Sequence, residues 1–162
     1  MTVKDLITEI DKIKVDMPLL ALYPILSLPD LLAKIDYPEI KGRNVVGERY
    51  KKWLIENNIV DNKKDAEELF KLRNAIFHSS DIDDKTKRTY VLSKGFSNNF
   101  VLRTFSKGHN EGWISHINLA ILHVIGENNK YLNTKISSAL IFYDDDCGFE
   151  QMSNDEKDES WA

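Results

Sequence analysis

The sequence has the size and composition of a single globular domain. Its 162 residues are 42% hydrophobic and 30% charged, which argues against a disordered chain, a coiled coil and a membrane protein. With one cysteine, Cys147, the chain can form neither an internal disulfide nor a thiolate cluster around a metal. The net charge of −4 argues against a nucleic-acid partner held by overall charge alone.

The acidic residues are concentrated at the C-terminal end. Residues 144–162 contain eight acids and one lysine, a balance of −7, so the −4 of the whole chain leaves residues 1–143 at about +3. We expect a single domain over 1–143 and an acidic, flexible tail over 144–162. The first residues lack the basic and apolar segments of a secretory signal, so we expect a cytoplasmic protein that does not contact a membrane.

Helical patterns fill the first half of the chain. Apolar residues three and four apart predict an amphipathic helix over 3–15. An apolar helix over 17–35 follows, with a break expected near residues 27–30 because Pro24 and Pro29 each remove a backbone hydrogen bond.

Two further helices are expected before residue 80. A helix over 45–59 should bury Tyr50, Trp53 and Leu54. The next helix has a candidate N-cap at Asp61 or Asn62 and closes near His78.

The pattern changes after residue 80. Two β-prone runs predict a small hairpin over about 89–105. A final helix is expected over 113–132, with an apolar stripe at Ile114, Ile117, Ile121, Val124 and Ile125. The predicted fold is therefore mainly α, a bundle of about five helices with a small β-hairpin inserted before the last helix.

The most function-like segment ends the fourth helix, from Arg73 to His78 (RNAIFH). On a helical wheel Arg73 lies in the middle of the apolar arc, while Asn74 and His78 lie along one border. Because an arginine keeps its charge, a position facing the core requires an anionic partner.

Two interpretations supply that partner. Arg73 can form an internal ion pair with one of three acids, Asp30, Asp36 or Glu48. Alternatively, Arg73 and His78 face a cleft or a dimer seam that binds an anion such as phosphate. The two residues are separated by about 7.5 Å along the helix axis. They would therefore converge on one ligand from two sides, or meet their copies across a two-fold axis.

The segment resembles the Arg-x4–6-His signature of the HEPN superfamily (higher eukaryotes and prokaryotes nucleotide-binding). Three stretches also look like a group of small, poorly characterised prokaryotic and phage proteins: residues 21–30 (ALYPILSLPD), 47–53 (GERYxxW) and 72–78 (LRNAIFH). The resemblance covers about residues 21–125, and it implies a HEPN-like helical bundle that forms a homodimer through the motif helix.

The resemblance also implies an activity, that of a metal-independent endoribonuclease in a toxin or phage-defence setting, without a cofactor. His78 would act as general acid or base, Arg73 would hold the scissile phosphate, and Asn74 would orient His78 or the phosphate. A protein partner such as an antitoxin would fit that setting. The alternative is a non-catalytic HEPN-like module that binds a nucleotide or a protein.

A metal site is not expected. His116 and His123 fall on one face of the predicted last helix, but roughly 10.5 Å apart along its axis, which is too far to share one ion. Only His123 and Glu127 could pair there. The acidic cluster near Cys147 lacks the loop and spacing of a calcium site.

Overall fold

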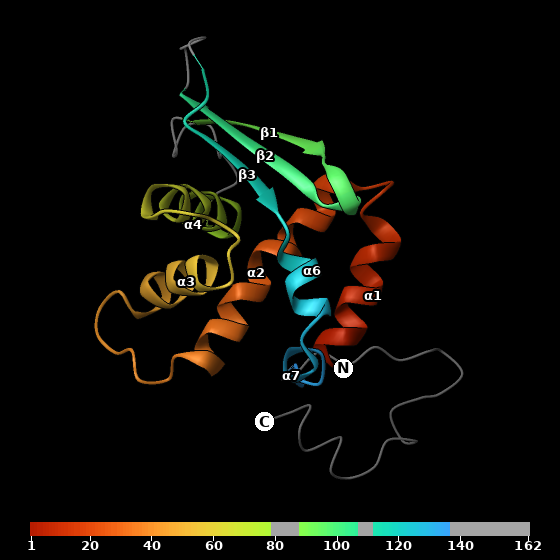
Figure 1. Ribbon diagram of the computed structural model, residues 1–162, viewed down its shortest axis with the longest axis vertical. Helices are drawn as coiled ribbons and strands as arrows, with labels where there is room; N and C mark the ends of the chain where they lie inside the picture. The colour runs from red at the N-terminus through yellow and green to blue at the C-terminus, as the bar shows by residue number, and fades with distance from the viewer. Residues whose placement is uncertain (79–87, 107–111, 137–162) are drawn as a thin grey trace.

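The computed structural model describes residues 1–78, 88–106 and 112–136, without the side chains of Phe77, His78 and Phe96. The described elements are α1 (Val3–Ile13), α2 (Pro18–Asp36), α3 (Val45–Glu56), α4 (Lys63–His78), β1 (Arg88–Lys94), the 3-10 turn η1 (Phe96–Asn98), β2 (Phe100–Ser106), β3 (Ser115–Leu119), α6 (Ile121–Gly126) and α7 (Asn129–Leu132). Figure 1 shows the strands side by side across one end of the molecule, with the helices on one side of them.

The first helix forms where the sequence predicts it. Thr2 and Asp5 make a capping box at its start, with the Thr2 N–H donating to Asp5 Oδ2 at 2.8 Å and the Asp5 N–H donating to Thr2 Oγ1 at 3.3 Å. The side chains of Val3 and Ile10 are buried at its two ends.

The second helix shows that the predicted break is wrong. α2 continues through Pro24 and Pro29. Each proline costs a helical hydrogen bond, but α2 buries eight residues and packs against α1, α3, α4 and α6. Burial along the whole helix outweighs the loss of those hydrogen bonds.

α2 is also long and apolar enough to cross a membrane, with a mean hydropathy of 1.4 in its most apolar window. Of that window, 44% is buried inside the fold. The central helix of a water-soluble domain has the same composition, because it too must contact apolar neighbours on several sides.

The third and fourth helices agree with the sequence analysis. Tyr50, Trp53 and Leu54 of α3 are all fully buried. Asn62 caps α4, since its side-chain oxygen accepts from the Asp65 N–H at 2.9 Å.

The sheet contains one strand more than the predicted hairpin. β1 and β2 pair antiparallel as expected, and β3 adds to β2 with Leu102 opposite Ile117 and Phe100 opposite Leu119. The single helix predicted over 113–132 is therefore wrong: its first part is β3, and only α6 and α7 are helical. The described fold is mixed α/β with mainly helical content, and not a purely helical bundle.

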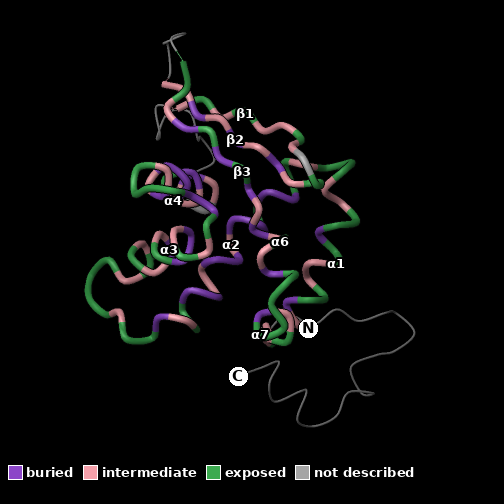
Figure 2. The backbone as a smooth tube through the Cα atoms, in the orientation of Figure 1, coloured by how far each residue is buried: buried purple, intermediate pink, exposed green. Residues whose placement is uncertain are grey.

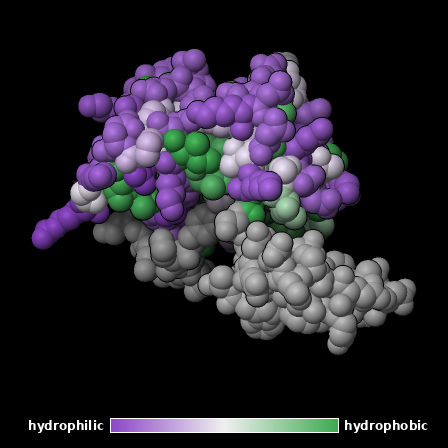
Figure 3. Space-filling view, turned by 90° about the horizontal axis from the view of Figure 1, so that it is seen from below, coloured by the Kyte–Doolittle hydropathy of each residue, from purple (hydrophilic) through white to green (hydrophobic). Residues whose placement is uncertain are grey.

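The buried residues of the helices and the sheet form one core, and Figure 2 marks buried segments of α2, α3, α4 and the strands in purple. The N-terminal residues are tied to the end of the described chain. Thr2 forms a β-bridge with Lys135, and the Val3 N–H donates to the Thr134 carbonyl at 2.9 Å. The face farthest from the sheet is mostly hydrophilic, with hydrophobic side chains in separate small areas (Figure 3).

Candidate functional site

The candidate site lies on the C-terminal half of α4. This helix buries Ala66, Leu69 and Leu72 against its neighbours, and it contacts α2, α3 and β3. Residue 73 follows directly on that buried face, so its side chain is directed toward α2 rather than outward into water.

Arg73 forms an ion pair with Asp30 of α2. The Arg73 Nε–H donates to Asp30 Oδ2 at 2.9 Å, and Arg73 Nη1 donates to Asn74 Oδ1 at 2.8 Å. The two charged side chains are 17% and 23% exposed. Of the two interpretations, the structure shows the internal ion pair, and Asp30 is the partner among the three acids considered.

Asp30 is held in a costly environment. Burial raises the pKa of its carboxyl above the ordinary value of 3.8, and the hydrogen bond and charge of Arg73 only partly offset that rise. Its second oxygen, Oδ1, is buried without a hydrogen-bond partner among the described residues. The carboxylate is therefore under-stabilised, although it faces an arginine.

The Phe70 ring of α4 lies beside the guanidinium and packs against Tyr50 of α3. Arg73 Cζ lies 5.8 Å from the centre of the Phe70 ring, and that ring lies 5.5 Å from the Tyr50 ring. Phe70 also fills the space above Gly47, where a Cβ atom would lie only 3.1 Å from Phe70 Cζ. These contacts fix the position of the helix turn that carries Arg73.

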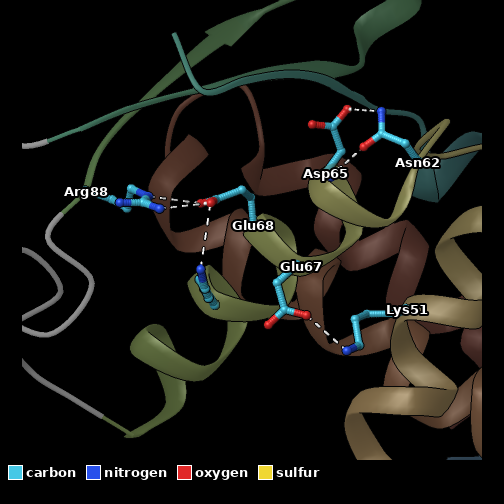
Figure 4. A network of polar contacts seen from close by, with 7 residues as sticks. Lys51, Asn62, Asp65, Glu67, Glu68 and Arg88 are labelled. Atoms are coloured by element: carbon cyan, nitrogen blue, oxygen red, sulfur yellow. Dashed lines mark hydrogen bonds and ion pairs between the residues drawn. The ribbon is translucent and has the colours of Figure 1, made fainter.

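A shallow hollow of about 380 Å³ lies beside Phe70, between α3 and α4. Its lining includes Arg43 and Lys51 together with Glu48 and Glu67. Lys51 is already paired with Glu67 at 3.0 Å, as Figure 4 shows. Charges of both signs thus balance in this hollow, which gives it little attraction for a phosphate.

His78 is the last residue of α4, and its side chain lies outside the described part of the structure. The backbone places it one and a half turns beyond Arg73 on the same continuous helix. Arg73 and Asn74 are brought together by a hydrogen bond. The catalytic roles of Arg73, Asn74 and His78 stay predictions.

A second buried ion pair joins α4 to the sheet. Glu68, with a side chain 6% exposed, accepts from Arg88 Nε at 3.2 Å and from Arg88 Nη2 at 3.1 Å (Figure 4). Lys71 Nζ lies 3.9 Å from the same carboxylate. This pair anchors the first strand to the motif helix, so its role is structural.

The histidines considered for metal binding are on different elements. His116 lies on β3 and His123 on α6, where His123 Nε2 is 3.3 Å from Glu127 Oε1. Within residues 1–78, 88–106 and 112–136, the structure shows no group of three His, Cys, Asp or Glu side chains able to hold a metal.

Sequence reasoning missed one cluster, formed on the sheet by Arg103, Phe105, Trp113 and His116. The alternation of polar and apolar residues from His116 to Leu119 was the available signal. Recognising it as a strand would have placed His116 beside Arg103.

Comparison with known proteins finds no match to a family model, to a curated protein or to a solved structure. The resemblance to the HEPN superfamily therefore depends on the residues quoted above.

Proposed function

We propose that the chain is a HEPN-like, metal-independent endoribonuclease that cleaves RNA through attack of a ribose 2′-hydroxyl. The observation that carries the proposal is the orientation of Arg73. Bonds to Asp30 and Asn74 hold its guanidinium in one position, with 17% of the side chain exposed, five residues before a histidine on the same helix.

The chemistry needs no group beyond these side chains. His78 takes the proton from the 2′-hydroxyl, or gives one to the departing 5′-oxygen, a role that suits an imidazole. The 2′-oxygen forms a bond to phosphorus as the bond from phosphorus to the 5′-oxygen breaks, which leaves a 2′,3′-cyclic phosphate and a 5′-hydroxyl. Arg73 stabilises the charge that develops on the phosphate.

A homodimer through α4 would complete the site. Two copies related by a two-fold axis place an Arg73 and a His78 from each chain around one shared pocket. We place such an enzyme in the cytoplasm, in a toxin or phage-defence setting, where a protein antitoxin would control it.

The test is incubation of the purified protein with labelled single-stranded RNA in EDTA. We expect cleavage to a 2′,3′-cyclic phosphate, and His78→Ala to lower the rate by about 100-fold or more. Arg73→Ala should have an effect of similar size. The matched control is His123→Ala, because this exposed histidine of α6 pairs only with Glu127 among the described residues.

Cleavage that survives both substitutions, or that requires a divalent metal, would overturn the proposal. A rate lowered equally by His123→Ala would also do so, because it would point to general damage to the fold.

The Arg73–Asp30 pair favours a second candidate, a non-catalytic HEPN-like module that binds a nucleotide or a protein. In that case Asp30 neutralises the charge of Arg73, and the ion pair stabilises the dimer. Wild-type protein would then be inert toward RNA, and sedimentation equilibrium would show Arg73→Ala shifting the dimer to monomer. A protein that remains monomeric at all concentrations excludes both the shared pocket and the braced dimer.

A further inference from the structure

The sheet has an outer face that no described helix covers. Figure 1 shows the helices gathered on the other side of the strands. Along β3, Ser115, Ile117 and Leu119 point into the core while His116 and Asn118 are exposed. By register, His116 lies beside Arg103 of β2, and Arg103 lies beside Val91 of β1.

Aromatic and basic side chains contact one another on this face. Arg103 Cζ lies 4.7 Å from the centre of the Trp113 ring. The Trp113 ring lies 6.0 Å from Phe105 and 5.1 Å from His116, with its edge or face turned to each. We call these four residues the outer sheet cluster. Trp113 remains 50% exposed, although a tryptophan is among the most costly side chains to leave in water.

Arg103 has no acidic side chain paired with it among the described residues. Its Nε atom is buried without a hydrogen-bond partner, and within the described residues it forms no ion pair. Arg73 and Arg88, by contrast, each have a carboxylate. A partly desolvated guanidinium in this state gains substantially when a phosphate or a carboxylate arrives.

The surrounding sequence is suited to a negatively charged ligand. Residues 88–106 and 112–120 contain no aspartate or glutamate, although the whole chain has 26 of them and a net charge of −4. The residues of the sheet therefore place no carboxylate of their own against an anion.

We propose that the outer sheet cluster binds single-stranded nucleic acid. Trp113 and Phe105 would stack against unpaired bases, and Arg103 would contact the phosphate between them, with His116 as a further hydrogen-bond donor or acceptor. The strand must be single because bases in a duplex already stack on one another. The outer sheet cluster shares no residue with Arg73, Asn74 and His78, so this proposal goes beyond the cleavage reaction and does not depend on it.

The experiment measures fluorescence anisotropy of labelled 12-mers that the proposed cleavage cannot destroy, oligo(dT) and 2′-O-methyl oligo(U). Neither carries a free 2′-hydroxyl. Trp113→Ala should weaken binding by about 5-fold or more, the range for loss of one stacked base. Trp113→Phe should stay close to wild type, whereas Trp113→Leu, which is apolar but not aromatic, should behave like alanine.

The contribution of the Arg103 charge to binding is tested with Arg103→Gln. The control is Lys4→Gln, which removes one positive charge from an exposed position on α1. Arg103→Gln should weaken binding and make the slope of log affinity against log salt shallower by about 0.7, the value for one phosphate contact on a single strand. Lys4→Gln should change neither quantity. Circular dichroism of each variant establishes that it is folded.

Equal affinity of folded Trp113→Ala and wild type would overturn the proposal, as would equally tight binding of a 12-base-pair duplex. If no oligonucleotide binds but Trp113→Ala lowers self-association, the face is a protein interface and the proposal is wrong. Cleavage is measured separately, on labelled RNA with free 2′-hydroxyl groups, so a failure of binding here is distinct from a failure of cleavage.

Discussion

Asp30 is the residue at which burial and ion pairing oppose each other. Burial raises the pKa of its carboxyl above 3.8, and Arg73 does not fully reverse the shift. The folded protein therefore holds this proton more tightly than the unfolded chain does. The contribution of Asp30 to stability should be largest at acid pH and should fall as pH rises from about 4 through the raised pKa.

Urea unfolding of wild type and Asp30→Asn between pH 3.5 and 7 measures this effect. The free energy of unfolding of wild type, taken relative to Asp30→Asn, should decline with rising pH and then level off. In an Arg73→Gln background the decline should extend to higher pH, because the favourable charge is gone. A difference that instead grows with pH would mean that the ion pair outweighs burial.

The sequence analysis indicated that Arg73 needs an anionic partner, but it did not identify which acid pairs with it. The helical wheel sufficed for the first point, since it placed a permanent charge on a buried arc. The choice of Asp30 depends on how α2 crosses α4, and α2 was expected to break near that residue. Arg103 went unnoticed because Trp113 and His116 come from another segment, which reaches Arg103 through the pairing of β2 and β3.

At the scale of elements, the turn between β1 and β2 contains both a required glycine and a strained serine. A Cβ atom on Gly95 would lie 2.7 Å from Val101 Cγ2 and 3.2 Å from the Asn99 carbonyl oxygen. Ser97 has a φ of 58°, in the left-handed region. Gly95→Ala should therefore destabilise the fold by about 1–3 kcal/mol, and Ser97→Gly should stabilise it by up to about 1 kcal/mol.

Thermal unfolding followed by circular dichroism compares the two substitutions, with melting temperatures expected to move in opposite directions. A stabilised Gly95→Ala variant would show that the turn can accommodate the added methyl group, against the short contacts that a Cβ atom would make there. A destabilised Ser97→Gly variant would mean that the entropy lost by glycine on folding exceeds the strain it removes.

Helix and strand were hard to separate by pattern alone in residues 113–119. Ile114, Ile117 and Ile121 have the spacing of a helix, while Ser115, Ile117 and Leu119 alternate as in a strand. β2 decides between them, because Phe100 and Leu102 offer a buried edge that β3 completes. The hairpin and the first, third and fourth helices were predicted because each has one clear period.

At the scale of the whole molecule, Tyr131 connects segments far apart in the sequence. The Trp53 indole N–H donates to the Tyr131 hydroxyl at 3.2 Å, and that hydroxyl donates to Asp36. Burial and the bond to Asp36 raise the pKa of Tyr131 to about 12. Tyr131→Phe leaves the buried indole N–H without its acceptor, so we expect a loss of about 1–3 kcal/mol in the free energy of unfolding.

A double-mutant cycle with Trp53→Phe isolates this connection. Urea titration should show that Tyr131→Phe lowers the free energy of unfolding by less in the Trp53→Phe background. The indole N–H that would lose its acceptor is absent from that background. Strictly additive costs would mean that the two side chains do not depend on each other.

The bridge between Thr2 and Lys135 has a consequence for synthesis on the ribosome. The α6 and α7 segments that α1 packs against lie much later in the chain, so they are translated later. At roughly 5–20 residues per second, translation from Ile13 to Tyr131 takes on the order of 10 s. During that interval the nascent α1 and α2 would expose apolar surface, which makes them binding sites for chaperones before the domain closes.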